Sequence, residues 1–188
     1  ATEISAGVSS LVVAGGMESM SNAPHFIRGA RRGEDFSYAS LESVLVHDGL
    51  KDAYTGESMG NTGETIADEH GITREQSDAF AVRSHALANR AWNEGWLDKE
   101  VFTVGGLERD EGIRTASSME SLSDLAAVFK EDGQVTAGNS SQVSDGASAI
   151  LIASEEAAAK YGLPVLARIV GYATSGVESR RVMSAPIP

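Results

Sequence analysis

Short, nearly all-apolar runs predict β-strands, most of them near the two ends of the chain. The runs cover residues 9–14, 101–104, 147–153 and 166–173. The first run stops at the pair Gly15 and Gly16, which we expect to break the strand. Continuous apolar runs of this length, above all the one at 147–153, are typical of strands that are buried on both faces of a sheet.

Capping signals and helical spacing predict helices between these strands. Thr73 and Gln76 have the spacing of a capping box, and the long helix that follows is expected to end at Gly95. Its apolar stripe is predicted to contain Ala79, Phe80, Val82, His85, Ala86, Ala88 and Ala91. Shorter helices are predicted over residues 41–47, 64–70, 119–129 and 154–161. The pattern predicts an α/β protein in which a loop-rich, mostly helical insert leaves a sheet and returns to it.

Composition excludes several classes of function. The net charge of −12, from 27 acidic and 15 basic residues, argues against a nucleic-acid partner, which would need basic patches. The apolar runs are too short to span a bilayer, so we expect no membrane partner and a cytoplasmic or organelle-matrix location. The chain has no cysteine, so disulfides, thiolate metal sites and a cysteine nucleophile are excluded within it. Both ends resemble interrupted elements, and we expect an internal portion of a longer protein.

A polar loop precedes the apolar run at 147–153. Gly138 and Asn139 predict a turn, and a cluster of hydroxyl, amide and carboxylate side chains follows it at residues 140–145. Such a loop can hold a ligand against a rigid sheet. It can equally be an ordinary turn before a strand, and the residues alone favour the turn.

Four motifs in sequence carry a resemblance to a known family. They are G-G-M-E-S-M-S-N-A-P-H at 15–25, M-G-N-T-G-E-T at 59–65, R-E-Q-S-D-A-F-A-V-R-S-H at 74–85 and V-T-A-G-N-S-S-Q-V-S-D-G-A-S-A at 135–149. Together they closely resemble the thiolases, which are acetyl-CoA acetyltransferases and 3-ketoacyl-CoA thiolases. The resemblance covers essentially all of this chain and about half of a complete family member.

The resemblance implies the thiolase fold, in which two similar α/β halves stack as αβαβα layers. Residues 1–16 resemble the end of a helix and a strand of the N-terminal half, and residues 17–138 resemble the loop domain that binds coenzyme A. Residues 139–161 resemble the return strand and helix, and residues 162–188 the linker and first strand of the C-terminal half. A tetramerisation segment is expected within residues 26–38, so the full-length protein is expected to be a homotetramer, a dimer of dimers.

The resemblance also implies contacts to coenzyme A or acyl-CoA, the substrate, with no covalently bound cofactor and no metal. The expected contact residues are Leu50, Met59, Arg114, Ser121, Leu125, Phe129, Ala137, Ser140, Ser141, Val143 and Met183. A pantetheine arm needs small residues to pass and a few hydroxyl partners to fix its register. Two positions depart from the family pattern: Ser58 stands where many members have histidine, and Gln142 where they have glycine.

The family's catalytic residues, a nucleophilic cysteine and a histidine–cysteine pair, have no counterpart in this chain. In the family they carry an acyl-enzyme mechanism for thiolytic cleavage of 3-ketoacyl-CoA or Claisen condensation of acetyl-CoA units. We therefore expect the full-length protein to be a thiolase and the 188-residue chain alone to be inactive. The alternatives are a non-catalytic coenzyme A binding or scaffold protein of thiolase descent, and a purely structural interaction protein.

Overall fold

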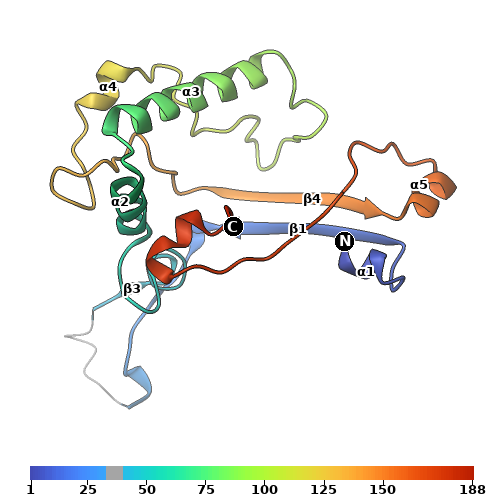
Figure 1. Ribbon diagram of the computed structural model, residues 1–188, viewed down its shortest axis with the longest axis horizontal. Coiled ribbons are helices and arrows are strands. Elements are labelled where there is room, and N and C mark those ends of the chain that lie inside the picture. Colours follow the sequence, from blue (N-terminus) through green and yellow to red (C-terminus); the bar gives the residue numbers. More distant parts are fainter. Residues whose placement is uncertain (33–39) are drawn as a thin grey trace. The chain divides into compact units, whose positions relative to one another are not determined.

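The computed structural model describes residues 1–32 and 40–188, which form two compact units (Figure 1). The first unit contains Ala1–Ala23 and Val143–Ser175, and the second contains Pro24–Gln142 and Gly176–Pro188. The chain therefore leaves the first unit after residue 23, returns to it at residue 143, and leaves it again after residue 175. Such an excursion agrees with the insert that the spacing of the strands predicts.

A two-stranded antiparallel ribbon forms the centre of the first unit. Strand β1 (Leu11–Ser19) pairs with β4 (Asp145–Ala153) along its whole length. The short helix α1 (Thr2–Ser5) precedes β1, and α5 (Glu155–Tyr161) follows β4. Ser154 caps α5 by accepting a hydrogen bond from the Ala157 amide, and Gly162 ends it with φ of 62°. The predicted strand at 147–153 and the helix after it are confirmed.

The expected break at Gly15 and Gly16 is wrong. Strand β1 continues through both glycines to Ser19, and Gly15 lies opposite Ala149 in β4. A Cβ on Gly15 would overlap the carbonyl oxygen of Ser148, so glycine here permits a close approach of the two strands. After β1 the chain turns into a short 3₁₀ helix, η1 (Met20–Asn22).

The expected burial of β4 on both faces is also wrong for the described residues. Ile150 is 64% exposed and Leu151 is 50% exposed, and within that part of the chain β4 pairs with β1 alone. The predicted strand at 166–173 is not formed in the structure, and Leu166 is 95% exposed. An apolar run becomes a strand only where another strand supplies hydrogen-bond partners.

The second unit is built around two helices, α2 (Met59–His70) and α3 (Arg74–Asn93). Helix α4 (Met119–Ser123) lies against α3, and the 3₁₀ helix η5 (Ser179–Ser184) lies against α2 (Figure 1). The remaining elements are the strands β2 (His25–Phe26) and β3 (Glu42–Ser43), which pair, the 3₁₀ helix η2 (Ala30–Arg32) and the π-helix η4 (Leu45–Gly49). The helix predicted over residues 41–47 is therefore replaced by β3 and η4.

The capping predictions for α3 are confirmed, and the predicted buried face is partly wrong. The Thr73 hydroxyl accepts the Gln76 amide at 3.3 Å, and the Gln76 side chain accepts the Thr73 amide at 2.9 Å. Phe80 of the expected stripe is 69% exposed, whereas Asp78 is 1% exposed. The buried side of α3 is shifted because a charged residue finds ion-pair and hydrogen-bond partners there.

Two helix boundaries differ from the pattern. Helix α2 begins at Met59, five residues before the predicted start, because Ser58 caps it by accepting the Asn61 amide. Helix α4 ends at Ser123 instead of continuing to Phe129. Beyond it the chain folds back, and the Val128 amide donates to the Val135 carbonyl at 2.9 Å. Tertiary hydrogen bonds therefore replace the helical ones.

Two other predictions concern residues outside regular elements. The strand expected at 101–104 is reduced to an isolated bridge between Val104 and Leu107. The expected tetramerisation segment at 26–38 is described only to residue 32, and its other residues lie outside the described part of the chain. In residues 1–32 and 40–188, no helix has the length and apolar character needed to cross a bilayer.

Candidate functional site

Leu50 and Met59 are brought together where α2 begins. The Met59 amide donates to the Leu50 carbonyl at 2.9 Å, and Lys51 pairs with Ser58 as an isolated bridge. The Ser58 hydroxyl also makes a short hydrogen bond to the Asn61 side chain. Ser58, one of the two departures from the family pattern, therefore has a defined role as the N-cap of α2.

The loop before α2 is closed by a buried carboxylate, Asp52, which is 7% exposed. It accepts the Tyr54 amide at 2.8 Å and the Thr55 hydroxyl at 3.0 Å. These bonds lower the pKa of Asp52, and the bond from the Tyr54 amide has the largest effect. A bond from the Ser179 hydroxyl lowers the pKa further. Asp52 therefore links the loop before α2 to the start of η5.

Met183 lies on η5, beside α2. Arg181 of η5 forms an ion pair with Glu69 of α2 at 3.0 Å, and Arg180 lies 3.7 Å from Glu57. These pairs are partly exposed and each contributes little stability by itself. Together with the Asp52–Ser179 bond they keep the segment that carries Met183 on α2, whose first residue is Met59.

Phe129 lies directly over the first turn of α2. A Cβ on Gly60 would overlap the Phe129 ring, and the Asn61 side chain donates to the Phe129 carbonyl at 3.4 Å. Glycine at position 60 therefore lets the aromatic ring approach the helix backbone. Met59 and Phe129, predicted as contact residues 70 positions apart in the sequence, belong to one local arrangement.

A second buried carboxylate, Glu64 of α2, holds the turn that leads to the polar loop. Glu64 is 3% exposed and accepts the Gln134 amide at 2.9 Å and the Val135 amide at 2.7 Å. A carboxylate that is buried with two backbone donors is a strong local constraint. The loop that begins at Gln134 is therefore fixed to α2.

Asp78 of α3 fixes the same loop from the other side. Its carboxylate accepts the Arg74 guanidinium at 2.8 Å and the Asn139 side-chain amide at 2.9 Å. The Thr136 amide in turn donates to the Asn139 side-chain oxygen at 2.8 Å. Ala137, Ser140 and Ser141 lie in or just after this held turn and are exposed.

Ser121 lies on α4 and Leu125 just after it, next to that turn. A Cβ on Gly138 would overlap the Leu122 side chain and would lie only 2.6 Å from the Leu125 side chain. The turn therefore packs directly on the end of α4. The Ser121 hydroxyl donates to the Ser118 carbonyl at 3.0 Å and completes a capping box with Ser118. Ser121 thus has a structural role in α4 in addition to its predicted contact.

Arg114 is held through its backbone. Its amide donates to Nδ1 of His85 at 3.1 Å, so His85, a residue of the expected apolar stripe of α3, is half-buried and has a hydrogen-bond partner. Two residues earlier, a Cβ on Gly112 would overlap the side-chain amide of Gln142. Gln142, the other departure from the family pattern, therefore packs against the segment that carries Arg114.

The structure brings ten of the eleven predicted contact residues into the second unit, and Val143 begins the return to the first. Sequence reasoning identified Asn139 as a turn residue and missed Glu64, Arg74 and Asp78, which help to hold the polar loop in place. The spacing of Arg74 and Asp78, four residues apart on one helix face, is the signal that could have found that pair. Across residues 1–32 and 40–188, no three histidine, aspartate or glutamate side chains gather as a metal site.

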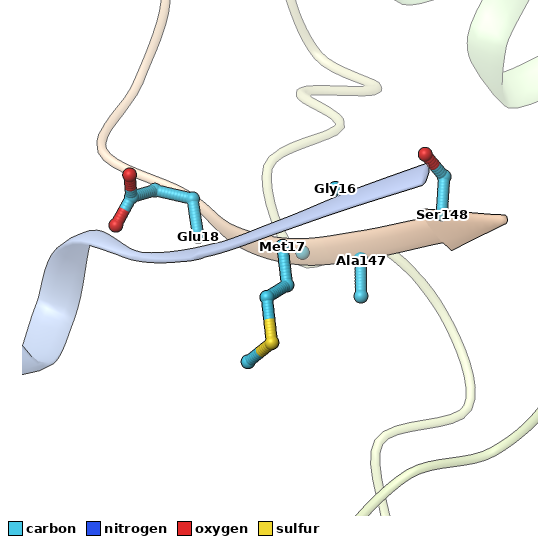
Figure 2. A pocket seen from close by; sticks show the side chains of 6 residues that line it. Gly16, Met17, Glu18, Ala147 and Ser148 are labelled. Carbon is cyan, nitrogen blue, oxygen red and sulfur yellow. The ribbon is translucent and has the colours of Figure 1, made fainter. Parts of the chain in front are cut away.

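A shallow hollow lies elsewhere, on the β1–β4 ribbon of the first unit. It is lined by Gly16, Met17, Glu18, Gly146, Ala147 and Ser148. Figure 2 shows the side chains of Met17 and Ala147 on one face of the ribbon and those of Glu18 and Ser148 on the other. The hollow contains none of the predicted contact residues.

Comparison with known proteins decides the family. Residues 1–156 match the family described as thiolase, N-terminal domain. The chain belongs to the thiolase family. An acetyl-CoA acetyltransferase of Pseudomonas aeruginosa is 39% identical over all of this chain and half of its own length. A probable acetyl-CoA acyltransferase of Staphylococcus aureus is 38% identical over 96% of the chain and 48% of its own length.

Solved thiolase structures have the same fold. Human mitochondrial 3-ketoacyl-CoA thiolase in complex with CoA superposes with a TM-score of 0.89 at 38% identity, over 96% of this chain and 46% of that one. An acetyl-CoA acetyltransferase from Syntrophomonas wolfei gives a TM-score of 0.90 at 33% identity, over 98% of this chain and 48% of that one. This thiolase chain therefore has part of the thiolase α/β fold and spans about half the length of the curated relatives it matches. Its contact residues and its division at residues 16, 138 and 161 stay predictions.

Proposed function

We propose that this chain supplies the coenzyme A binding groove of an acyl-CoA C-acyltransferase. The whole enzyme would cleave 3-ketoacyl-CoA with coenzyme A, or condense two acetyl-CoA units in the reverse direction. Membership of the thiolase family supports the reaction class. The observation that carries the binding role is the polar loop, which Glu64 and Asp78 hold from two helices while Ser140 and Ser141 stay exposed.

The held loop is suited to a pantetheine arm for a physical reason. The arm is long and flexible, and it carries two amides that need fixed partners. A loop whose backbone is already bonded to buried carboxylates loses little further entropy when a ligand binds. Exposed hydroxyls at Ser140 and Ser141 can donate to the amide carbonyls of the arm, and the small side chain of Ala137 leaves space beside it.

The chemistry of acyl transfer would come from residues outside these 188. In thiolases a cysteine thiolate attacks the acyl carbonyl, the bond to the leaving carbon or sulfur breaks, and coenzyme A or an enolate then takes the acyl group. The chain contains no cysteine, so it offers no thiolate for that step. We expect turnover of acetoacetyl-CoA only when the missing cysteines and histidine are supplied, and a homotetramer only for the full-length protein.

Titration calorimetry of the 188-residue chain with coenzyme A tests the binding role. We expect saturable binding, and Ser141→Ala should raise Kd by about two- to tenfold, the effect of one hydrogen bond. Ser10→Ala is the matched control, because Ser10 is an exposed serine beside β1 and should leave Kd unchanged. A folded chain that does not bind coenzyme A would contradict the proposal.

The absence of cysteine also favours a second candidate, a non-catalytic coenzyme A binding protein of thiolase descent. An assay of thiolysis separates the two. Acetoacetyl-CoA and coenzyme A are supplied to the longest product of the reading frame that contains this chain. Production of acetyl-CoA supports the enzyme, and coenzyme A binding without turnover supports the second candidate.

A further inference from the structure

The buried ion pair of Arg74 and Asp78 lies between the two segments that carry the predicted groove residues. The Asp78 side chain is 2% exposed and that of Arg74 is 23% exposed. An ion pair removed from water this far costs desolvation energy, which is offset only if the remaining polar atoms also find partners. The remaining polar atoms of this pair therefore need hydrogen-bond partners in the surrounding segments.

Arg74 binds Asp78 through Nε and also bonds to the end of α4. Its Nη2 donates to the Leu122 carbonyl at 2.5 Å and to the Leu125 carbonyl at 3.0 Å. Both carbonyls lie where α4 stops, and the Leu122 carbonyl also accepts the Leu125 amide at 3.1 Å. Arg74 thus fixes the wall of the predicted groove that contains Ser121 and Leu125.

Asp78 binds Arg74 through Oδ2, and its Oδ1 accepts a hydrogen bond from the polar loop. It accepts the Asn139 side-chain amide at 2.9 Å, and the same amide group donates to the Gln134 carbonyl at 2.8 Å. Asn139 therefore closes the turn at residues 134–139 and ties it to α3. This turn carries Ala137 and leads into Ser140 and Ser141, the opposite wall of the predicted groove.

We propose that Arg74 and Asp78 are positioning residues that set the spacing between the two walls of the coenzyme A groove. The inference rests on the proposed function, because the walls are defined by the predicted contacts. The pair reaches each wall by a direct hydrogen bond to its backbone or to Asn139. A change in the pair therefore moves α4 and the polar loop relative to each other without removing any contact to the ligand.

The test uses Asp78→Asn, which keeps the size of the side chain and removes its charge. Asp68→Asn is the matched control, since Asp68 of α2 forms an exposed ion pair with Lys130. The exchanged pair Asp78→Asn with Asn139→Asp restores one donor and one acceptor across the contact and should recover part of the effect. Asn139→Ala cuts the link to the loop and leaves the ion pair intact, so it serves if Asp78→Asn does not fold.

Two measurements decide the outcome: the Kd for coenzyme A by calorimetry, and amide hydrogen exchange over residues 119–125 and 134–141. We expect Asp78→Asn to raise Kd about tenfold and to speed exchange in both segments. Asp68→Asn should change neither. A folded Asp78→Asn variant with unchanged Kd and unchanged exchange overturns the proposal, as does a variant that is only less stable to heat.

Failure of the proposed function gives a different result. If the unaltered chain does not bind coenzyme A, the groove assignment fails, and hydrogen exchange alone decides the spacing role. Faster exchange in both segments of the variant then supports the role of the pair in holding α4 and the loop together. Faster exchange in one segment only would contradict it.

Discussion

Gly60 and Gly63 of α2 offer a matched test of the packing against Phe129. Replacing glycine by alanine within a helix ordinarily stabilises a protein by about 0.5–1 kcal/mol. At Gly63 the new Cβ would lie 3.5 Å from Cγ2 of Val135, an ordinary contact. At Gly60 it would overlap the Phe129 ring. The same substitution should therefore have opposite effects at two positions of one helix.

The magnitudes follow from these contacts. Gly63→Ala should increase the free energy of unfolding by up to about 1 kcal/mol. For Gly60→Ala the cost of overpacking is about 1–3 kcal/mol, so after the helical gain the variant should lose up to about 2.5 kcal/mol. In a chain of this length about 1 kcal/mol corresponds to about 2–4 °C in Tm. Urea unfolding followed by circular dichroism measures both changes.

A double-mutant cycle tests the cause of the effect at Gly60. In a Phe129→Ala background the overlapping ring is absent, so Gly60→Ala should be neutral or stabilising. The coupling energy between the two sites should then be about 2 kcal/mol. Additive effects, or a Gly60→Ala variant as stable as Gly63→Ala, would refute the placement of Phe129 over the helix. A fall in coenzyme A affinity of Gly60→Ala would further link this packing to the groove.

Three further predictions concern caps, pH and the second departure from the family pattern. Thr73→Ala removes the N-cap of α3 and should cost about 1 kcal/mol in urea unfolding, whereas an unchanged midpoint would contradict the capping box. Hydrogen bonds from the Ser21 hydroxyl, the larger cause, and from the Ser21 amide lower the pKa of Asp145 in the folded state. The contribution of Asp145 to folding stability is therefore complete above the ordinary aspartate pKa of about 3.9, and it is lost as pH falls through the lowered value. Asp145→Asn should reduce the pH dependence of the free energy of unfolding in that acid range. An unchanged pH dependence would argue against the contact between Ser21 and Asp145. Gly112→Ala should lower the Tm of the unaltered chain, and it should lower the Tm of a Gln142→Ala variant much less. Equal losses of Tm in the two backgrounds would refute the contact between Gly112 and Gln142.

The polar loop shows how far sequence reasoning reached for the candidate site. The motif at 135–149 marked the loop and, through the family resemblance, its expected contact residues. It did not identify Glu64 and Asp78, which lie about 60 to 70 residues earlier in the chain and hold the loop by long-range hydrogen bonds. Such partners are set by how helices pack, and neither periodicity nor composition records them.

The sequence by itself determined the features that depend on neighbouring residues. The capping box at Thr73, the cap at Ser154 and the glycine that ends α5 each depend on atoms within a few residues, so local spacing is sufficient to predict them. The tertiary structure alone decided how the chain continues after α4, because the Val128 amide bonds to the Val135 carbonyl and the Arg74 guanidinium donates to the Leu122 and Leu125 carbonyls. It also decided that β1 runs through two glycines, because β4 pairs with both of them and its backbone approaches Gly15 more closely than a side chain there would allow.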